Sequence, residues 1–252
     1  MHIQYAARSE IGLKRNNNED SYKIELCDGQ TSPQINNSML FAVADGMGGH
    51  PCGEVASMMA CESLKGFLDT PGKISEKKVQ SILVKIFFYI DDQIKLYTRK
   101  NPDCLHMGTT LSVIVILGEK AVIAHVGDTR IYRLHDGKLR LLTTDHTFVQ
   151  EMVEKGALTT EMAATSPHRN VLTEVVGTDE PLENVFTQTL DLVPGDRFLL
   201  SSDGLHGSVS FQDIELMMEK GNDPEETARR LLTRTMVEGG QDDITLIVVF
   251  TS

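Results

Sequence analysis

The chain has 252 residues, of which 40% are hydrophobic, so it can bury one sizeable core and need not be divided into two domains. Its formal net charge of −12 and pI near 5.1 exclude nucleic acid and anionic membrane as main partners, because both would repel it. No apolar run approaches the ~20 residues that span a bilayer, and the four cysteines form no C-x-x-C pair, so we expect a cytoplasmic protein with reduced thiols and no membrane insertion.

Hydrophobic periodicity and turn residues divide the chain into alternating strands and helices. In chain order, the expected elements are strands at 2–8, 21–27 and 39–45, helices at 53–68 and from Ser75 to before Pro102, four strand-like segments between 109 and 142, short helices at 148–155 and 160–164, strands at 185–190 and 197–202, a helix at 223–236, and a strand at 242–250. A polar loop at 12–20 separates the first two strands.

Two stretches shape the expected architecture. The four segments between 109 and 142 are joined by short links that leave no room for a helix, which predicts an antiparallel meander. The mixed stretch at about 143–182 is interpreted as a flap that contacts substrate. Helices clustered around antiparallel strands predict an α+β fold, a central antiparallel β-sandwich flanked by helices on both faces, in a single domain spanning 1–252.

Acidic residues stand at the ends of several strand-like apolar runs. Asp-Gly pairs often form hairpin turns, and Asp28-Gly29 and Asp136-Gly137, which lie among polar residues, are interpreted as such turns. Asp45-Gly46 and Asp203-Gly204 instead follow near-continuous hydrophobic runs, so their carboxylates should emerge from the core. Carboxylates that converge at a core edge repel each other unless a cation neutralises them, which favours a metal site.

Oxygen ligands suit hard cations such as Mg²⁺ or Mn²⁺. Two ions could share a bridging carboxylate and activate a water molecule as nucleophile, and Asp45 is the candidate bridge. Arg15 could clamp a phosphate in a bidentate manner, although its loop could equally form a solvated Arg/Glu surface pair. His125, within a strand, is expected to be a hydrogen-bonded core residue rather than a ligand.

Five motifs in order along nearly the whole chain resemble those of the metal-dependent protein phosphatase 2C (PPM) family, in its bacterial branch. These motifs are Arg15…Asn18-Glu19-Asp20, Asp45-Gly46-Met47-Gly48-Gly49, Gly127-Asp128-Thr129-Arg130, Ser202-Asp203-Gly204-Leu205 and Gly239-Gly240-Gln241-Asp242-Asp243-Ile244-Thr245. The resemblance implies a four-layer αββα fold and hydrolysis of phosphoserine and phosphothreonine in proteins, opposing a cognate kinase. It also implies two Mg²⁺ or Mn²⁺ ions per chain and a weaker third.

The same resemblance assigns roles to individual residues. It implies that Asp45 bridges both ions, that the Gly46 carbonyl is a ligand of one of them, and that Asp203 and Asp242 complete one metal site. Glu19 and Asp20 would bind the other ion, directly or through water, and Arg15 would hold the phosphate. Asp128 would help to bind a looser third ion beside Asp203.

Three positions depart from the pattern of many relatives. Met47 replaces a histidine proposed as general acid, so the leaving group must be protonated by water or another group. Gly207 replaces a carboxylate, which weakens the third metal site. Asp243 replaces a frequent asparagine and adds charge near the centre.

Two other functions stay open at this point. The first is a catalytically silent module that keeps the fold to bind phosphoproteins, against which the intact Arg15, Asp45, Asp203 and Asp242 speak. The second is a two-metal enzyme that hydrolyses a small phosphate ester or a nucleotide. The chain has no Walker-type loop or Rossmann fingerprint that would support a nucleotide.

Overall fold

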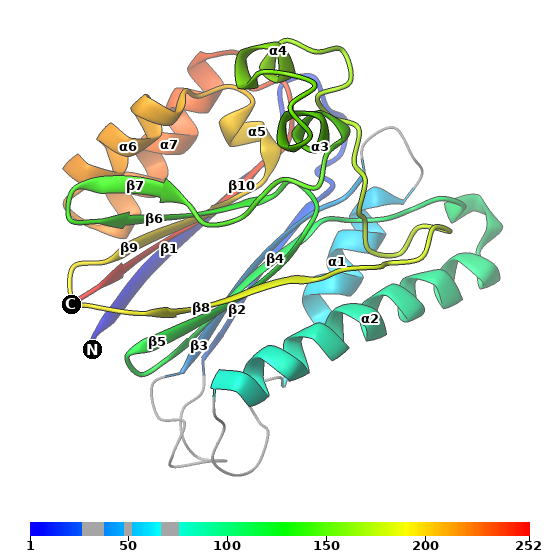
Figure 1. Cartoon of the computed structure of the whole chain (residues 1–252), viewed down its shortest axis with the longest axis horizontal. Helices are drawn as coiled ribbons and strands as arrows, with labels where there is room; N and C mark the ends of the chain where they lie inside the picture. The colour runs from blue at the N-terminus through cyan, green and yellow to red at the C-terminus, as the bar shows by residue number, and fades with distance from the viewer. Residues whose placement is uncertain (27–37, 48–51, 67–75) are drawn as a thin grey trace.

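The computed structural model describes residues 1–26, 38–47, 52–66 and 76–252 (Figure 1). Within these residues there are two five-stranded antiparallel sheets. The first sheet has the strand order β2-β3-β4-β5-β8, and the second sheet has the strand order β1-β10-β9-β6-β7. The turn predicted at Asp28-Gly29 and the helix cap predicted at Ser75 lie outside the described residues. None of the described helices combines the length and the apolar character that a membrane crossing requires.

The elements follow the predicted chain order closely. They are β1 (Ile3–Glu10), β2 (Asp20–Leu26), β3 (Met39–Asp45), α1 (Gly53–Ser63), α2 (Glu76–Lys100), the short 3-10 helix η2 (Pro102–Cys104), β4 (Leu111–Leu117), β5 (Lys120–Val126), β6 (Arg130–His135), β7 (Lys138–Leu141), α3 (Phe148–Glu154), α4 (Thr160–Ala164), β8 (Phe186–Asp191), β9 (Arg197–Ser201), α5 (Asp203–His206), α6 (Phe211–Lys220), α7 (Pro224–Val237) and β10 (Ile244–Thr251).

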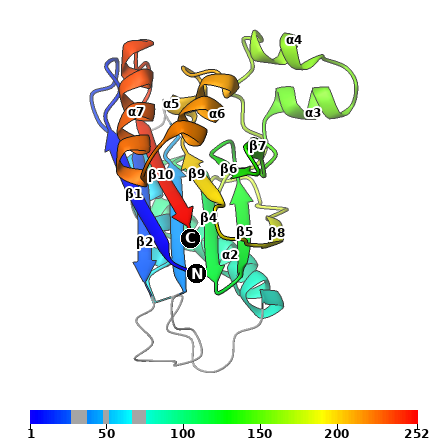
Figure 2. The same cartoon turned by 90° about the vertical axis from the view of Figure 1, so that its left-hand side faces the viewer.

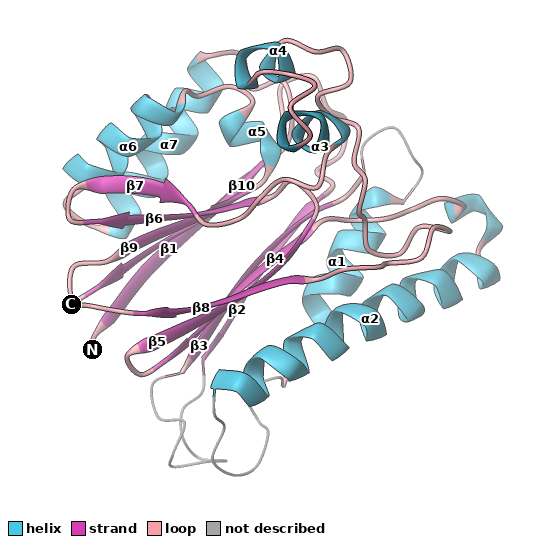
Figure 3. Ribbon diagram, in the orientation of Figure 1, coloured by secondary structure: helices cyan, strands magenta, loops and turns pink. Residues whose placement is uncertain are grey.

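The two sheets pack face to face, and helices cover both outer faces. Figure 3 shows α1 and α2 against the sheet that contains β3 and β4, and α6 and α7 against the sheet that contains β9 and β10. In the view of Figure 2, α3 and α4 project beyond the end of the sandwich where α5 lies. The predicted α+β fold, a β-sandwich flanked by helices on both faces, is confirmed.

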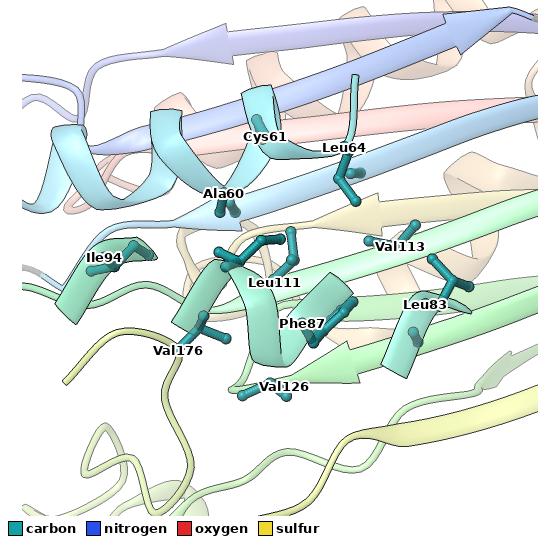
Figure 4. Close-up of a cluster of buried hydrophobic side chains, with 14 of the residues drawn as sticks. Ala60, Cys61, Leu64, Leu83, Phe87, Ile94, Leu111, Val113, Val126 and Val176 are labelled. Carbon is teal, nitrogen blue, oxygen red and sulfur yellow. The ribbon is translucent and has the colours of Figure 1, made fainter. Parts of the chain in front are cut away.

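Three apolar layers hold this arrangement together. Figure 4 shows the layer between the helices and the first sheet, where Leu83 and Phe87 of α2 lie near Leu111 and Val113 of β4. A second layer lies between the two sheets and includes Phe41, and a third lies under α6 and α7. Because both faces of each sheet are covered, the central strands are apolar at nearly every position, which explains their continuous hydrophobic runs.

The predicted meander is wrong in one respect. β4 pairs with β5 and β6 pairs with β7, but β5 and β6 belong to different sheets. The chain changes sheet at Gly127, whose φ of +104° favours glycine and whose place would bring a Cβ within 2.5 Å of Thr110. The Asp136-Gly137 turn is confirmed, since it joins β6 to β7 with both residues at positive φ.

The expectation of reduced thiols is wrong for two cysteines. Cys52, just before α1, and Cys104, at the end of η2, form a disulfide with their Cα atoms 5.4 Å apart. Among the described residues Cys61 is free and buried. The bridge therefore joins the start of α1 to the segment that follows α2.

Candidate functional site

The apolar layer between the sheets becomes polar at one end. Side chains alternate along a strand, and Phe41 and Val43 of β3 belong to the layer between the sheets. Asp45 is the next residue on that face. The register places Asp20 of β2 directly opposite Asp45, so two carboxylates meet at this end of the sandwich.

The second sheet closes this polar end. Phe198 and Leu200 of β9 face the first sheet, and Ser202 continues the same alternation. The Ser202 hydroxyl donates to Asp20 Oδ2 at 2.7 Å and accepts from the Thr245 amide at 2.9 Å. Asp20 is thus held across the gap between the sheets.

A cleft of about 770 Å³ opens above this end. The predicted site residues that line it are Arg15, Asp45, Asp128, Asp203 and Asp242. Met47 and segments 170–175 and 178–181 complete much of its wall. Four aspartates from distant parts of the chain, each close to the end of a strand, therefore line one cavity. The sequence predicted this convergence.

Burial and mutual repulsion disfavour the charged forms of these acids. Burial is the main cause that raises the pKa of Asp20 to about 7 and that of Asp203 to about 6, with neighbouring carboxylates adding to the shift. The pKa of Asp45 lies well above its ordinary value because the group is buried and Asp20, Asp203 and Asp128 surround it. The pKa of Asp128 is raised by burial and by Asp203.

Arg15 has a closer partner than the surface glutamate that its spacing suggests. Its Nη2 contacts both oxygens of Asp242, at 2.6 and 2.7 Å, whereas Nη1 lies 4.0 Å from Glu19 Oε2. The hydrogen bond to Asp242 raises the Arg15 pKa above its ordinary value. The guanidinium therefore lies beside the acids in the cleft rather than in a solvated turn.

Glu19 is fixed through its backbone, and one oxygen of its carboxylate has no hydrogen-bond partner among the described residues. Its carbonyl accepts from the Gly46 amide at 3.1 Å and from Ser57 Oγ at 2.6 Å. That oxygen is Oε2, which is buried. Gly53 makes room for it, because a Cβ there would lie 3.1 Å from the Glu19 carboxyl carbon.

These features fit a hard divalent cation. The groups that could act as metal ligands are carboxylate oxygens, which hard cations prefer. A bound cation would also satisfy Glu19 Oε2, a buried oxygen that has no hydrogen-bond partner among the described residues. In the described part of the chain, no three acidic, histidine or cysteine side chains already converge as a metal-binding group. Two of the acids have other partners, since Asp242 contacts Arg15 and Asp20 contacts Ser202.

Comparison with known proteins decides the family. The family model described as "Protein phosphatase 2C" matches residues 17–239, most of the chain. The chain belongs to the protein phosphatase 2C family. It is similar to the serine/threonine protein phosphatase PstP of Mycobacterium tuberculosis, at 37% identity over 98% of this chain and 44% of PstP. It is also similar to the serine/threonine phosphatase Stp of Listeria monocytogenes, at 33% identity over 99% of this chain and 95% of Stp.

Solved structures agree with this phosphatase 2C assignment. The S. agalactiae serine/threonine phosphatase matches with a TM-score of 0.90 and 29% identity over 100% of both chains. The catalytic domain of PstP in complex with two manganese ions matches with a TM-score of 0.82 and 34% identity, over 98% of this chain and 97% of that chain. Because this chain spans 44% of the full PstP, the activity of that whole protein is not carried over directly.

The three departures from the phosphatase 2C pattern have definite places. Met47 lines the cleft, and its amide donates to the Gly108 carbonyl at 3.0 Å. Gly207 ends α5, where its amide donates to the Asp203 carbonyl at 2.7 Å. Asp242 lines the cleft, whereas Asp243 is only 3% exposed and accepts two backbone amides.

Sequence reasoning missed a cation close to the acids. Arg130 at the start of β6 binds Asp145 in a bidentate manner, with Nε–Oδ1 at 2.9 Å and Nη2–Oδ2 at 2.7 Å. Its charge opposes the rise in the pKa of Asp128 and Asp203. Arg130 lies in one of the five motifs that resemble the family, but nothing in the sequence pairs it with Asp145.

His125 is a core residue, as predicted. Its ring contacts Ser112 Oγ through Nδ1 at 2.8 Å and the Thr144 carbonyl through Nε2 at 3.1 Å. Burial, with a contribution from His146, lowers its pKa to about 3, so the ring is neutral. Nε2 then donates to Thr144, and Nδ1 accepts from Ser112.

Proposed function

We propose that this chain is a metal-dependent serine/threonine protein phosphatase that hydrolyses phosphoserine and phosphothreonine in proteins. The observation that carries the proposal is the meeting of Asp45, Asp203, Asp242 and Arg15 in one cleft of a phosphatase 2C fold. Relatives that match nearly the whole chain are named serine/threonine phosphatases.

The proposed cofactors are two Mg²⁺ or Mn²⁺ ions, as the PstP complex with two manganese ions suggests. The residues that would hold them are Asp45 and the Gly46 carbonyl, Asp203, Asp242, Glu19 and Asp20, with Asp128 beside Asp203 for a weaker third ion. When bound, these ions supply an activated water nucleophile and neutralise the acidic cluster.

Arg15 has the shape and the charge to orient the substrate. Its planar guanidinium can bind two phosphate oxygens and carries a permanent positive charge. In the structure it contacts Asp242, so it already lies within the cleft. Met47 has no proton to give, and we assign protonation of the leaving alkoxide to water that enters the open cleft.

The wider biological setting is part of the same proposal. Residues 1–252 would act as one catalytic domain, with 143–182 as a flap beside the cleft. Its partners would be phosphoproteins and a cognate kinase in the cytoplasm.

Parallel assays with different substrates test the proposed reaction. With Mn²⁺ present, we expect turnover of a phosphothreonine peptide to exceed that of free nucleotides and of a small aryl phosphate. A preference for nucleotides or the aryl phosphate would support the alternative function, a two-metal enzyme that hydrolyses small phosphate esters, and would contradict the proposal. Tight Mn²⁺ and phosphopeptide binding without any turnover would identify a silent binding module.

A further inference from the structure

Asp243 is buried beside the cleft and bonded to a different part of the chain. Its Oδ1 accepts from the Gly12 amide at 3.0 Å, and its Oδ2 accepts from the Glu19 amide at 2.9 Å. These two amides stand at the two ends of the loop that carries Arg15. One carboxylate, only 3% exposed, therefore joins both ends of that loop.

The same loop lies directly on the segment that precedes β10. The Leu13 amide donates to the Gly240 carbonyl at 2.7 Å. A Cβ on Gly12 would lie 2.4 Å from the carbonyl carbon of Asp242, so the two backbones touch at this point. Because Asp242 also contacts Arg15, the loop and the Asp242-Asp243 pair form one connected unit.

We infer that Asp243 is a positioning residue that braces the Gly12–Glu19 loop and so fixes Arg15 and Glu19 at the cleft. The inference rests on the proposed function only for what Arg15 and Glu19 then bind. In this chain an aspartate satisfies both amides, because both of its oxygens accept. An asparagine would direct its NH₂ group at one of the two backbone N–H groups, and one amide would lose its partner.

This role explains why the chain carries an aspartate at this position. A loop of eight residues that is pinned at both ends has fewer conformations to lose when it binds phosphate or metal. Loss of the Asp243 carboxylate would leave the acids of the cleft in place and would move only Arg15 and Glu19, the groups that the loop presents. Asp243 thus acts through Arg15 and Glu19 and does not touch the reacting atoms itself.

Amide hydrogen exchange in the metal-free protein tests the brace without any reference to activity. In the wild type, the Gly12 and Glu19 amides should exchange more slowly than those of Asn16 and Asn17. In Asp243→Asn, at least one of the two amides should exchange about tenfold faster or more, as expected for a lost hydrogen bond to a charged group. Equal exchange of all four wild-type amides would overturn the inference even if the variant failed to fold.

Asp196→Asn is the matched control. Asp196 is also fully buried and also accepts a backbone amide, from Val193 at 2.9 Å, but it lies before β9, at the end of that strand away from Ser202. Its substitution should speed exchange at Val193 and lower the overall stability, but Gly12 and Glu19 should stay more protected than in Asp243→Asn. Exchange at Gly12 and Glu19 that is as fast in this control as in Asp243→Asn would show a general loss of stability and would contradict a specific brace.

Kinetics then show whether the brace acts through Arg15. In Asp243→Asn we expect the KM for a phosphothreonine peptide to rise about tenfold with a smaller change in kcat, and the dissociation constant for Mn²⁺ measured by calorimetry to rise as well. In an Arg15→Ala background the same substitution should change KM less than twofold, because the group proposed to bind the substrate phosphate is already gone. Equal effects in both backgrounds would refute the coupling. A wild-type protein without phosphatase activity would refute the proposed function and leave the exchange result standing.

Discussion

Asp20 on β2 lies directly opposite Asp45 on β3, so two carboxylates from neighbouring strands face each other at the polar end of the sandwich. Burial and the charges of other acids raise the pKa of both groups. In the metal-free protein this arrangement opposes folding, and bound cations would remove the opposition. The fold therefore holds mutually repelling carboxylates together at the place where the proposed chemistry needs metal ligands.

Substituting Asp45 should separate stability from activity. In Asp45→Asn the repulsion is relieved, so the metal-free variant should melt at a higher temperature than the metal-free wild type. Its kcat/KM with Mn²⁺ should fall by about 10²- to 10³-fold, as for the loss of a central electrostatic group. Differential scanning calorimetry in chelator and a phosphopeptide assay measure the two effects. A lower melting temperature in chelator would contradict the electrostatic account.

The pH dependence of the metal-free protein follows from the same groups. Asp20 and Asp203 have folded-state pKa values of about 7 and about 6, above the ~3.9 of an unfolded aspartate. Their contribution to stability is therefore complete below the unfolded value and is lost as the pH rises through the folded values. We expect the melting temperature in chelator to rise as the pH falls from about 8 to about 5. A fall over that range would show that other groups dominate.

Asp196 carries the opposite kind of charge arrangement. It is fully buried and binds Arg133 Nε at 3.0 Å and His135 Nδ1 at 2.8 Å. Burial alone would raise its pKa, but the hydrogen bonds from Arg133, Val193 and His135 hold it below the ordinary value. Its stabilisation is therefore present at neutral pH and is lost as the pH falls through that lowered value.

Removing the Asp196 charge should destabilise the protein without affecting the cleft. Asp196→Asn leaves the partly buried Arg133 without its anion, and we expect a loss of about 2 kcal/mol in the free energy of unfolding. The KM for a phosphopeptide should stay within twofold of the wild type. Urea denaturation and steady-state kinetics check both statements, and an unchanged urea midpoint would argue against the buried pair.

The Cys52–Cys104 bridge should stabilise the oxidised protein. It closes a segment with a sequence separation of 52 residues, for which the chain-entropy model gives about 4 kcal/mol. Cys104→Ser should lower the free energy of unfolding by up to this amount under oxidising conditions. The reductant should destabilise the wild type and have no further effect on the variant. Equal stability of the oxidised wild type and Cys104→Ser would contradict the bridge.

The sequence was most informative where a residue's place depends on its own strand. Asp45 follows an apolar strand, and the period of two puts it on the face of Phe41 and Val43 without any knowledge of the partner sheet. The same local logic predicted the turn at Asp136-Gly137. Strand ends and the chemistry of carboxylates therefore located most of the candidate site.

Partners that lie far apart in the sequence could not be predicted in this way. Asp243 accepts from Gly12 across 231 positions, and only the packed fold brings the two together. The pairing of Cys52 with Cys104 has no spacing signature either. The sequence could not predict that β5 and β6 belong to different sheets. Both sheets are covered on both faces, so their strands have the same apolar pattern.

The helix α6 was missed although a signal for it existed in the sequence. The helix α6 begins after Ser210, whose hydroxyl accepts from the Asp213 amide at 3.1 Å, and Ile214 and Met218 are buried at helical spacing. A capping serine before an i, i+4 apolar pair is a standard helix start. The helix lies in the chain between β9 and the Asp223 cap of α7, and together with α7 it covers the second sheet.

The most direct test of the central claim measures phosphate release from a phosphothreonine peptide as Mn²⁺ is titrated into chelator-treated protein, for the wild type, Asp203→Asn and the exposed control Asp92→Asn. We predict no release without metal and recovery with Mn²⁺ in the wild type and in Asp92→Asn. In Asp203→Asn, kcat/KM should be lower by about 10²-fold or more. Full activity in chelator, or wild-type activity in Asp203→Asn, would contradict the account.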